Sequence, residues 1–379
     1  MKKKVLLAVV AVALLFSATS CRKEEKKANV IIKAITENTE VDFTAFDISV
    51  NNLRTLTKID AKLDNNGEYR GQIDAGTYTI TISWRDGNAS LFGSKESLSI
   101  VEDAVIEIPL TFSIGKPDGL IFKEIFHNGE TNNGQMMHPD QYFVLVNNGT
   151  STVYADGVCF AIARHPNFAE SDDFTNYLPD AVIAGLVYAI PGSGTTYPVA
   201  PGEEIVIART AINHHASYEN AVDLSGAHFE AFDPTASDDV DNPNVPNLIA
   251  YYSMFGQFMM HPRGYLPPFI FKVEDNDIQQ FLEDNKVQFV DSDGEVEYAY
   301  KINTDLILDG IETGNQGQLA VKALPNSVDK GMVQVTGCHR QMLVVRKFTD
   351  ENGRRHYIDT DDSSADCEIQ IGANPYPRP

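Results

Sequence analysis

The sequence lacks the common catalytic signatures. It contains no Gly-x-Ser-x-Gly elbow, no His-Glu-x-x-His helix, no phosphate-binding P-loop and no glycine-rich dinucleotide fingerprint. These absences argue against the common hydrolases and nucleotide-dependent enzymes, and we predict a protein that is not an enzyme. With 53 Asp and Glu residues in the chain, the proximity of two carboxylates in sequence cannot identify a glycosidase pair.

Positive charge is scarce as well. The chain has 30 Lys and Arg against 53 Asp and Glu, which gives a formal net charge of −23. An acidic body of this size repels phosphate backbones, so we predict no nucleic-acid partner. Only 26 Gly and 18 Pro are present and 43% of the residues are hydrophobic, which excludes collagen-like and low-complexity classes. At roughly 150 residues per domain, a length of 379 residues predicts two or three domains.

The chain has no apolar run of the roughly 20 residues that span a bilayer. Its N-terminus has three lysines, Lys2–Lys4, and then a shorter apolar run, Val5–Phe16, an order that is typical of a signal peptide. Small residues then lead to Cys21, and the arrangement resembles the lipobox of bacterial lipoproteins. The resemblance implies a signal peptide over residues 1–20 and a lipid on Cys21 that anchors the protein to a membrane. The alternative is an ordinary secretory signal cleaved near Ala18.

A charged tether, residues 21–29, follows the signal peptide. Lys23, Glu24 and Glu25 place one base and two acids just past the cysteine, and they resemble the surface-export signal of Bacteroidota lipoproteins. The resemblance implies a lipid-anchored protein of the bacterial outer membrane that faces the exterior. The alternative is a plain solvated tether, because charge runs usually mean no more than that.

Cysteine is scarce, with four residues in the chain. If Cys21 carries lipid, Cys159, Cys338 and Cys367 remain, an odd number that permits at most one intramolecular disulfide in an oxidising compartment. The sequence does not decide which pair would form. Three buried free thiols are the alternative, because a buried cysteine behaves as a small hydrophobic residue.

Residues 30–115 alternate between apolar and polar side chains. In Tyr78–Trp84 every second residue is apolar, and Ile106–Phe112 repeats the pattern, which predicts strands with one face in solvent. Asp64–Gly67 is a turn cluster between two further strands. The segment NNGEYRGQIDAGTYTITISW resembles the carboxypeptidase-regulatory or transthyretin-like β-sandwich. The resemblance implies an immunoglobulin/transthyretin-like sandwich that carries no chemistry and spaces a functional domain away from the membrane.

A breaker-rich linker separates this sandwich from a second β-rich domain, residues 120–379. Apolar strand patterns recur there, and Asn147–Gly149 has the composition of a β-hairpin turn. Asp277 is predicted to cap a short amphipathic helix with Ile278 and Leu282 on one face. The fold is therefore predicted to be mainly β, a first sandwich followed by a larger β-sandwich-type domain with long loop insertions and a short helix.

Three motifs in the second domain, IPGSGTTYPVAPGEEIVIARTAINH, VDLSGAHFEAF and DNPNVPNL, resemble a family of Bacteroidota outer-membrane lipoproteins classed as a domain of unknown function. More remotely, this domain resembles the lamin-tail-type immunoglobulin-like sandwich. The nearer resemblance implies a surface location and association with TonB-dependent uptake systems. It therefore implies a TonB-dependent receptor of the outer membrane as partner, and no characterised activity.

The tetrad Met-Met-His-Pro occurs twice in the chain, each time beside aromatic residues. Thioether and imidazole groups are ligands of Cu(I) and of some haem irons, so the tetrads are candidate ligands of a soft metal or haem. The candidate residues are His138, His261, Met137 and Met260. The alternative is that the methionines fill gaps in a core while the histidines occupy turns.

An acidic cluster in the long irregular stretch of residues 213–268 is a candidate calcium site. Alternating oxygen ligands on a tight loop are what Ca²⁺ requires, although the cluster does not match the full twelve-residue loop. The candidate ligands are Asp238, Asp239, Asp241 and Asn242. The alternative is that these residues form turns, as Asp and Asn often do.

Together these features predict a surface-exposed outer-membrane lipoprotein that acts as a non-catalytic binding accessory of a TonB-dependent uptake system. Two alternatives stay open, a metal- or haem-binding lipoprotein that uses the Met/His tetrads and a structural or adhesin-like surface protein. Aromatic residues crowd residues 251–269, where they would form either a stacking platform for a ligand or part of the core. The sequence identifies neither the ligand nor the oligomeric state.

Overall fold

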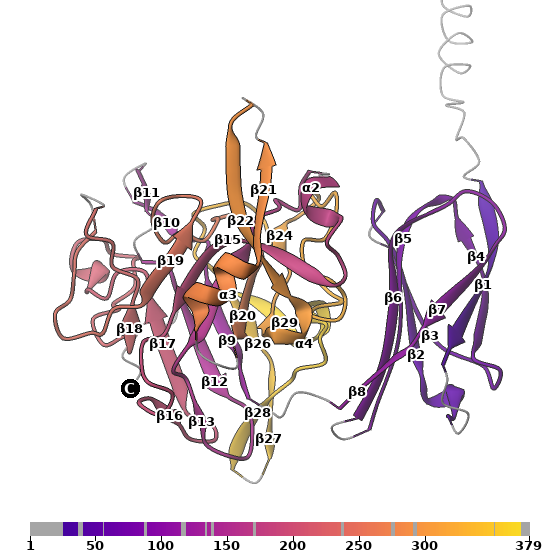
Figure 1. Ribbon diagram of the computed structural model, residues 1–379, viewed down its shortest axis with the longest axis horizontal. Coiled ribbons are helices and arrows are strands. Elements are labelled where there is room, and N and C mark those ends of the chain that lie inside the picture. Colours follow the sequence, from indigo (N-terminus) through magenta and orange to yellow (C-terminus); the bar gives the residue numbers. More distant parts are fainter. Residues whose placement is uncertain are drawn as a thin grey trace, which may run out of the picture.

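The computed structural model describes residues 26–36, 41–55, 57–86, 89–114, 119–132, 135–137, 140–169, 172–235, 239–273, 277–290, 294–351 and 353–372 (Figure 1). Strands dominate these residues, and the fold is mainly β, as predicted. Cys21, Lys23, Glu24 and Glu25 lie outside the described residues. No helix within the described ranges is long and apolar enough to cross a membrane.

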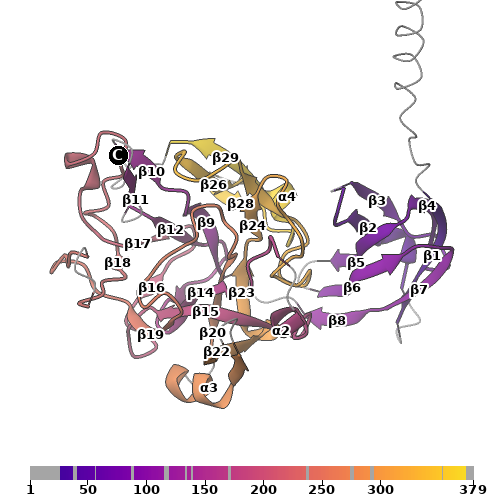
Figure 2. The same ribbon diagram turned by 90° about the horizontal axis from the view of Figure 1, so that it is seen from above.

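Two sheets form the N-terminal sandwich, the name used here for the described residues between 26 and 114 (Figure 2). One sheet has the order β4-β1-β7 and the other β3-β2-β5-β6-β8. Alternate side chains point between the sheets and form one apolar core, in which Ile32, Ile48 and Ile80 are fully buried. The elements are β1 (Lys27–Ile35), η1 (Phe43–Ala45), β2 (Asp47–Asn52), β3 (Lys58–Lys62), β4 (Glu68–Asp74), β5 (Gly76–Asp86), β6 (Ala89–Ile100), β7 (Ala104–Pro109) and β8 (Thr111–Ile114).

The alternating segment Ile106–Phe112 does not form one strand, contrary to the prediction. It divides at Leu110, because β7 pairs in parallel with β1 whereas β8 pairs with β6 in the other sheet. Pro109 is the last residue of β7, and the pairing with β1 ends just after it, where the backbone N–H of Leu110 donates to the carbonyl oxygen of Ile35 at 2.7 Å. At the other end of the sandwich, β1 begins at Lys27, inside the segment predicted to be a tether.

The polar face of β5 is not in solvent, which also differs from the prediction. Thr79 and Thr81 point away from the core of the sandwich but are only 3% and 1% exposed. The C-terminal half of the chain packs on this face (Figure 1), and the Nδ2 atom of Asn326 donates to Oγ1 of Thr81 at 2.8 Å. A second polar contact joins Nζ of Lys58 to Oδ2 of Asp362 at 3.0 Å. The threonines therefore lie at a junction between two parts of the molecule.

A second and larger sandwich forms the C-terminal β region, the name used for the described residues between 119 and 372. Its six-stranded sheet has the order β18-β17-β12-β9-β26-β29, and its seven-stranded sheet has the order β21-β22-β15-β14-β20-β23, with β19 also paired to β15. Phe143 of one sheet stacks on Phe160 of the other with ring centroids 4.3 Å apart, so the main core lies between the two sheets. The elements are β9 (Leu120–Phe126), β10 (Glu130–Asn132), β11 (Gln135–Met137), β12 (Tyr142–Asn147), β13 (Val153–Tyr154), β14 (Val158–Ala163), α2 (Asp172–Thr175), β15 (Ala181–Ala189), β16 (Pro198–Val199), β17 (Glu204–Ala208), η2 (His214–Ala216), β18 (Phe229–Glu230), β19 (Ile249–Ser253), β20 (Pro268–Lys272), α3 (Ile278–Asp284), β21 (Lys286–Val290), β22 (Val296–Asn303), η3 (Thr304–Leu306), β23 (Ile307–Gly310), β24 (Thr313–Asn315), β25 (Val333–Val335), β26 (Met342–Arg346), β27 (Phe348–Glu351), β28 (Arg354–Tyr357), α4 (Ser363–Asp366) and β29 (Cys367–Ile371).

The predicted helix is confirmed as α3. The side chain of Asp277 accepts a hydrogen bond from the backbone N–H of Gln280 at 3.1 Å, which caps the helix. Ile278 and Leu282 are buried in a second core that lies on the outer face of the seven-stranded sheet. Strands β14 and β15 are consequently buried on both faces, which explains why their sequences are almost continuously apolar.

The hairpin predicted at Asn147–Gly149 is wrong. Strand β12, which ends there, lies between β9 and β17, and the next strand, β13, pairs with β16 instead. Nδ2 of Asn147 donates to the carbonyl oxygens of Ser151 and Val199, each at 2.8 Å. The segment is therefore a loop that these side-chain hydrogen bonds hold in place. The Asn-Asn-Gly composition marked a change of direction correctly but carried no information on which strands pair.

The three cysteines of the described chain are free thiols, so none of the disulfides that the sequence permits is formed among them. Cys159 lies in β14 and Cys367 in β29, and both are buried, whereas Cys338 is partly exposed. Burial raises the pKa of the Cys367 thiol to about 12, which keeps it protonated and unreactive at neutral pH.

Candidate functional site

The surroundings of the two Met-Met-His-Pro tetrads meet at one end of the C-terminal β region. Gln141, fully buried and three residues after His138 in sequence, makes the connection. Its Nε2 donates to the carbonyl oxygens of His127 and Met260, each at 2.7 Å, and its Oε1 accepts from the backbone N–H of Met260 at 3.1 Å. One amide side chain therefore fastens the segment that follows the first tetrad to the backbone of the second.

Asn128 fastens a third loop, residues 336–342, to the same place. Its Nδ2 donates to the carbonyl oxygens of Pro262 and Gly337 at 2.9 and 2.8 Å, and its Oδ1 accepts from the backbone N–H of Arg340 at 2.7 Å. These bonds hold an unusual backbone, because His339 has a φ of 55°, in the left-handed region that residues other than glycine rarely adopt.

The histidines of this end have different environments. His127 is 2% exposed, and burial together with the nearby charge of His261 lowers its pKa to about 4. His261 is half-buried, with its ring 4.8 Å from that of Tyr265, and its Nδ1 accepts a hydrogen bond from the backbone N–H of Arg263 at 3.2 Å. The lowered pKa leaves the imidazole of His127 neutral at pH 7, the form in which a histidine can bind a metal.

The tetrads do not present a complete set of ligands in the described chain. Met260 is 2% exposed and its side chain packs in the main core, as the gap-filling alternative predicted. His138 lies outside the described residues, and Met137 is described only by its backbone, which pairs with Glu130 in β10. Within the described ranges, no group of three or more His, Cys, Asp or Glu residues is arranged to hold a metal ion. The shared metal or haem site stays a prediction.

The candidate calcium ligands that the structure describes are used in the loop itself. The hydrogen bonds join Asp239 Oδ1 to Thr210 Oγ1 at 2.8 Å, Asp239 Oδ2 to Asp233 N at 2.9 Å, Asp241 Oδ1 to Asn247 Nδ2 at 3.0 Å, and Asn242 Nδ2 to Ala211 O at 2.7 Å. Asp238 lies outside the described residues. These bonds shape a packed loop, which is the role that the turn alternative predicted for Asp and Asn.

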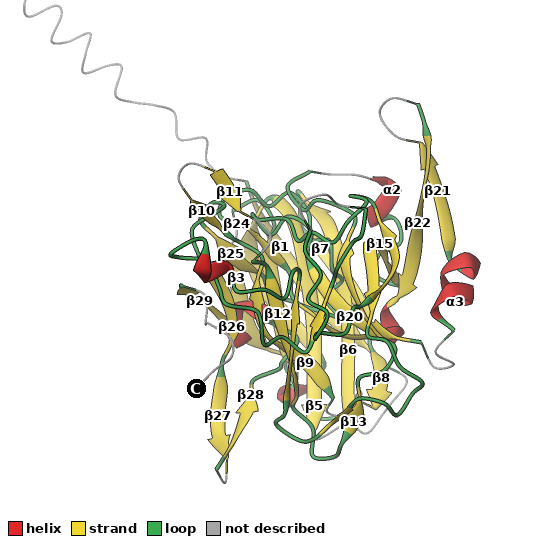
Figure 3. Cartoon of the chain, turned by 90° about the vertical axis from the view of Figure 1, so that its left-hand side faces the viewer, coloured by secondary structure: helices red, strands yellow, loops and turns green. Residues whose placement is uncertain are grey.

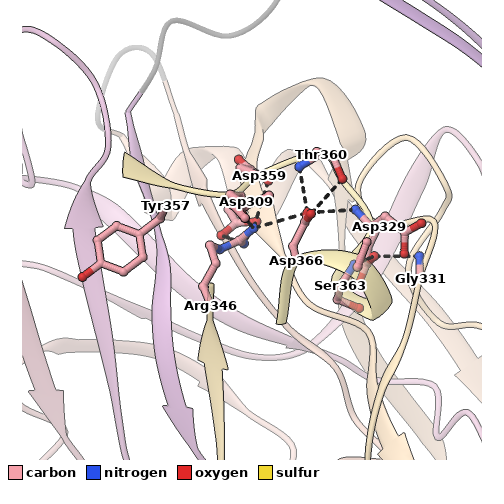
Figure 4. Close-up of polar contacts among 12 residues, drawn as sticks. Asp309, Asp329, Gly331, Arg346, Tyr357, Asp359, Thr360, Ser363 and Asp366 are labelled. Carbon is pink, nitrogen blue, oxygen red and sulfur yellow. Dashed lines mark hydrogen bonds and ion pairs between the residues drawn. The ribbon is translucent and has the colours of Figure 1, made fainter. Parts of the chain in front are cut away.

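A buried network of charges surrounds Arg346, and the sequence did not reveal it (Figure 4). Arg346 is the last residue of β26 and is 3% exposed. Burial raises the pKa of Asp309, although the positive charge of the Arg346 guanidinium acts in the opposite direction. Nη2 of Arg346 lies 3.0 and 2.8 Å from the two carboxylate oxygens of Asp309. Nη1 lies 3.0 Å from Asp359 and 3.7 Å from Asp366. The guanidinium is thereby surrounded by three carboxylates.

Asp329 is the centre of the adjoining half of the network in Figure 4. Its Oδ1 accepts from the backbone N–H groups of Gly331 and Ser363, each at 2.8 Å, and its Oδ2 accepts from that of Glu312 at 2.6 Å. Glu312 is itself fully buried, and burial raises its pKa to about 7 against the opposing charge of Lys322. The acids of this network accept hydrogen bonds from backbone groups of distant loops, and these bonds hold the loops together.

Two small cavities lie within the described chain. Each has a volume of about 10 Å³, and one lies beside His165 and Phe174 while the other lies in the main core beside Phe160. Each has room for about one water molecule, whereas pockets for small ligands measure about 300 to 1,000 Å³. Neither of these two cavities can therefore hold a small ligand.

Comparison with known proteins finds a family model that matches part of the chain. Residues 200–373 match the model of a family described as a protein of unknown function, DUF4876. The crystal structure of a DUF4876 family protein from Bacteroides thetaiotaomicron is similar over 92% of this chain and 96% of its own, with a TM-score of 0.61 and 21% sequence identity. At that identity the similarity establishes a common fold.

Two other solved structures are similar only weakly. A putative adhesin from Bacteroides ovatus has a TM-score of 0.18 and 9% identity over 73% of this chain and 83% of its own. BcpA, the major pilin subunit of Bacillus cereus, has a TM-score of 0.17 and 13% identity over 76% of this chain and 94% of its own. Scores this low do not indicate a common fold. No curated protein sequence matches the chain.

Proposed function

We propose that this chain is a surface-exposed lipoprotein of the bacterial outer membrane that binds a macromolecule and has no catalytic activity. The observation that carries the proposal is the small size of these two cavities, because about 10 Å³ leaves no room for a small substrate in either of them. The N-terminal sandwich, which resembles transthyretin-like modules in sequence, would act as the spacer between a lipid on Cys21 and the C-terminal β region.

The anchor is tested by replacing the thiol that acylation requires. We expect Cys21→Ala to release the protein from membranes while circular dichroism of the purified protein stays unchanged. The matched control is Cys338→Ala, which removes the partly exposed free thiol and should leave the protein in the membrane fraction. Membrane retention of Cys21→Ala equal to that of the control would contradict the lipoprotein proposal.

Export to the cell surface is tested separately. We expect the triple replacement of Lys23, Glu24 and Glu25 by Ala to retain the lipid anchor but to protect the protein from protease added to intact cells. Digestion at the same rate as the wild type would show that these residues are only a solvated tether.

The partner in this proposal is a TonB-dependent receptor of the outer membrane, with the chain as an accessory of uptake. Affinity purification of the wild-type lipoprotein from detergent-solubilised outer membranes should recover such a receptor in stoichiometric amount, and the Cys21→Ala variant should recover much less. Recovery of no receptor from membranes that contain the wild-type protein would contradict the uptake role and leave the anchor proposal intact.

One specific observation favours a second candidate, the binding of a soft metal or haem. His127 and His261 lie close enough for the charge of one to lower the pKa of the other, and both are beside the segment that follows the first tetrad. Titration of the protein with Cu(I) and with haem tests this candidate. We expect His261→Ala to weaken binding, whereas His215→Ala, which removes an exposed imidazole, should not. Equal binding by the two variants would assign the tetrads to packing.

A further inference from the structure

The hairpin of β21 and β22 forms an arm that projects from the C-terminal β region (Figure 3). Strand β22 pairs with β15 only through Tyr300–Asn303, whereas all of β21 pairs along Val296–Tyr300. In the described chain, the outer residues Val296–Ala299 therefore have β21 as their one neighbouring strand. The arm thus carries a two-stranded ladder beyond the sheet that supports it.

The β22 side of the arm is braced against the body. Arg164 forms an ion pair with Glu297, and its guanidinium lies 4.3 Å from the centre of the Phe289 ring. The hydroxyl of Tyr252 donates to the carbonyl oxygen of Tyr298 at 2.9 Å. These contacts fix the direction of the arm and occupy the β22 edge, so the available edge is that of β21.

The backbone groups of β21 that face this open edge can be identified. The N–H of Lys301 donates to the carbonyl oxygen of Asn285 at 2.9 Å, which makes these two residues a hydrogen-bonded pair of the antiparallel ladder. Hydrogen-bonded pairs alternate along such a ladder, so Val287 and Phe289 also bond inward to β22. Lys286, Gln288 and Val290 therefore direct their N–H and C=O groups outward, away from β22.

The open edge of β21 has few of the features that prevent a sheet edge from pairing with another strand. The strand has the sequence Lys-Val-Gln-Phe-Val, without proline, and its one charged residue is Lys286 at the end. Apolar side chains near it are in solvent: Val290, Val296 and Tyr298 are 56%, 49% and 47% exposed. Exposed edges with this composition pair readily with another strand.

We propose that β21 is a homotypic docking strand, which pairs antiparallel with β21 of a second copy of this chain about a two-fold axis at Gln288. This register is self-complementary, because it opposes Gln288 to its own copy and Lys286 to Val290 of the second copy, so that outward groups meet outward groups. It also opposes Val287 to Phe289, an apolar pair on the other face. The two seven-stranded sheets would join into one.

Symmetry favours the antiparallel direction. A two-fold axis through the paired strands makes them antiparallel and closes the pair, so that each open edge is used once. Lys286 does not oppose this pairing, because its Nζ atom lies 3.7 Å from Glu283 and 4.8 Å from the centre of the Tyr298 ring within its own arm. The occupant that this edge fits best is therefore a second, inverted copy of itself.

Site-specific crosslinking of the full chain in detergent tests the register. In a Cys338→Ser background, which removes the partly exposed native thiol, we expect Gln288→Cys to form a covalent dimer under mild oxidation. Opposed residues in a hydrogen-bonded pair have Cα atoms about 5.5 Å apart, within the range of a disulfide. Val290→Cys is the matched control, because its two copies would be about 14 Å apart in this register and should not crosslink. Crosslinking through Val290→Cys and not through Gln288→Cys, or equally through both, would overturn the proposal.

A second pair of variants tests the backbone bonds without new thiols. Gln288→Pro removes an outward N–H and leaves the inward ladder intact, whereas Gln288→Ala keeps that N–H. In sedimentation over about a hundredfold range of concentration, we expect the proline variant to weaken dimerisation by about tenfold or more relative to the alanine variant. Equal thermal midpoints by circular dichroism would confirm that both variants are folded. A monomeric wild type over the whole range, or equal dimerisation of the two variants, would also overturn the proposal.

Discussion

The N-terminal sandwich and the C-terminal β region differ most in what they bury. In the described part of the sandwich the buried polar residues are Asn52, Thr79 and Thr81, and none is charged. The C-terminal β region buries many ionisable side chains, of which Arg346 and Glu312 are examples. The core of the first region is therefore stabilised by apolar packing, whereas the core of the second contains buried charges that stabilise it only while their partners are present.

This difference can be measured separately in each region, because the chain has a single tryptophan, Trp84. It stacks on Phe46 of the N-terminal sandwich with ring centroids 5.9 Å apart. Trp84 fluorescence therefore reports unfolding of the sandwich, and circular dichroism reports both regions. A transition seen by circular dichroism and not by Trp84 belongs to the C-terminal β region.

The largest effect is expected from removing the charge at the centre of the buried network. Arg346→Leu should lower the free energy of unfolding of the C-terminal β region by about 3 to 5 kcal/mol, because Asp309 and Asp366 keep their burial and lose their counter-charge. Urea denaturation should show this loss by circular dichroism, with the Trp84 transition unmoved. The control Arg340→Met, at an exposed side chain, should change neither transition appreciably. An equal shift of the Trp84 transition would show that the two regions unfold together.

The converse experiment opens a cavity in the sandwich. Ile80 is fully buried in the middle of β5, so Ile80→Ala should lower the free energy of unfolding of the sandwich by roughly 3 kcal/mol. The Trp84 transition should move to lower urea concentration while the remaining transition seen by circular dichroism stays in place. Ile35→Ala is the control, because that side chain is 44% exposed. Equal effects of the two variants would contradict an apolar core centred on β5.

The next largest effect is expected from acid, which should lower the stability of the C-terminal β region and not that of the N-terminal sandwich, because all nine histidines lie after residue 119. The folded pKa of His127, about 4, is below its ordinary value of 6.5, so the unfolded chain takes up a proton between these values and the folded chain does not. The stabilising contribution is complete above pH 6.5 and falls as the pH is lowered, by about 2 kcal/mol between pH 6.5 and pH 5.

His127→Leu should remove this pH-dependent part of the stability of the C-terminal β region. The measurement is the difference in urea midpoint between wild type and variant at pH 6.5 and at pH 5, with His215→Leu at an exposed position as control. The Trp84 transition should be the same at both pH values for every protein. A wild-type pH dependence that survives in His127→Leu would assign it to other groups.

The smallest effect is expected at the junction of the two regions. Lys58→Met breaks the contact with Asp362, in which the lysine side chain is 35% exposed, and should cost less than about 1 kcal/mol in either transition. Lys62→Met, which breaks the exposed pair with Asp47 inside the sandwich, is the control. A larger shift in both transitions for Lys58→Met alone would show that the junction couples the regions.

The sequence predicted the parts of the fold that have a local cause. Alternation marked Ile80 and its neighbours as a strand, and Asp277 marked the start of α3, because strand period and helix capping act over a few residues. The prediction that the polar face of β5 lies in solvent is wrong, because periodicity carries no information on contacts with distant residues. Asn326, which bonds to this face, lies far from β5 in the sequence.

The buried network and the loop cluster escaped sequence analysis for the same reason. Arg346 and Asp309 are 37 residues apart, and a single arginine at the end of an apolar strand resembles any solvent-facing residue. Of the candidate site, the sequence identified Met260 and His261, because thioether and imidazole side chains are recognisable as metal ligands. It missed Gln141 and Asn128, which assemble the site, because an amide that binds backbone groups has no local pattern.

The parallel pairing of β1 with β7 has a mechanical consequence. In the proposed lipoprotein the chain is held at Cys21 and pulled at the start of β1, and the load from the rest of the molecule enters through β8, directly after β7. The two forces then run in opposite directions along neighbouring strands, so the ladder from Val30 opposite Ala104 to Ile35 opposite Pro109 is loaded in shear. Its hydrogen bonds must yield together and not one after another, as they would in an unzipping hairpin. Under the proposed anchoring, the N-terminal sandwich would therefore resist a force applied between Cys21 and the C-terminal β region.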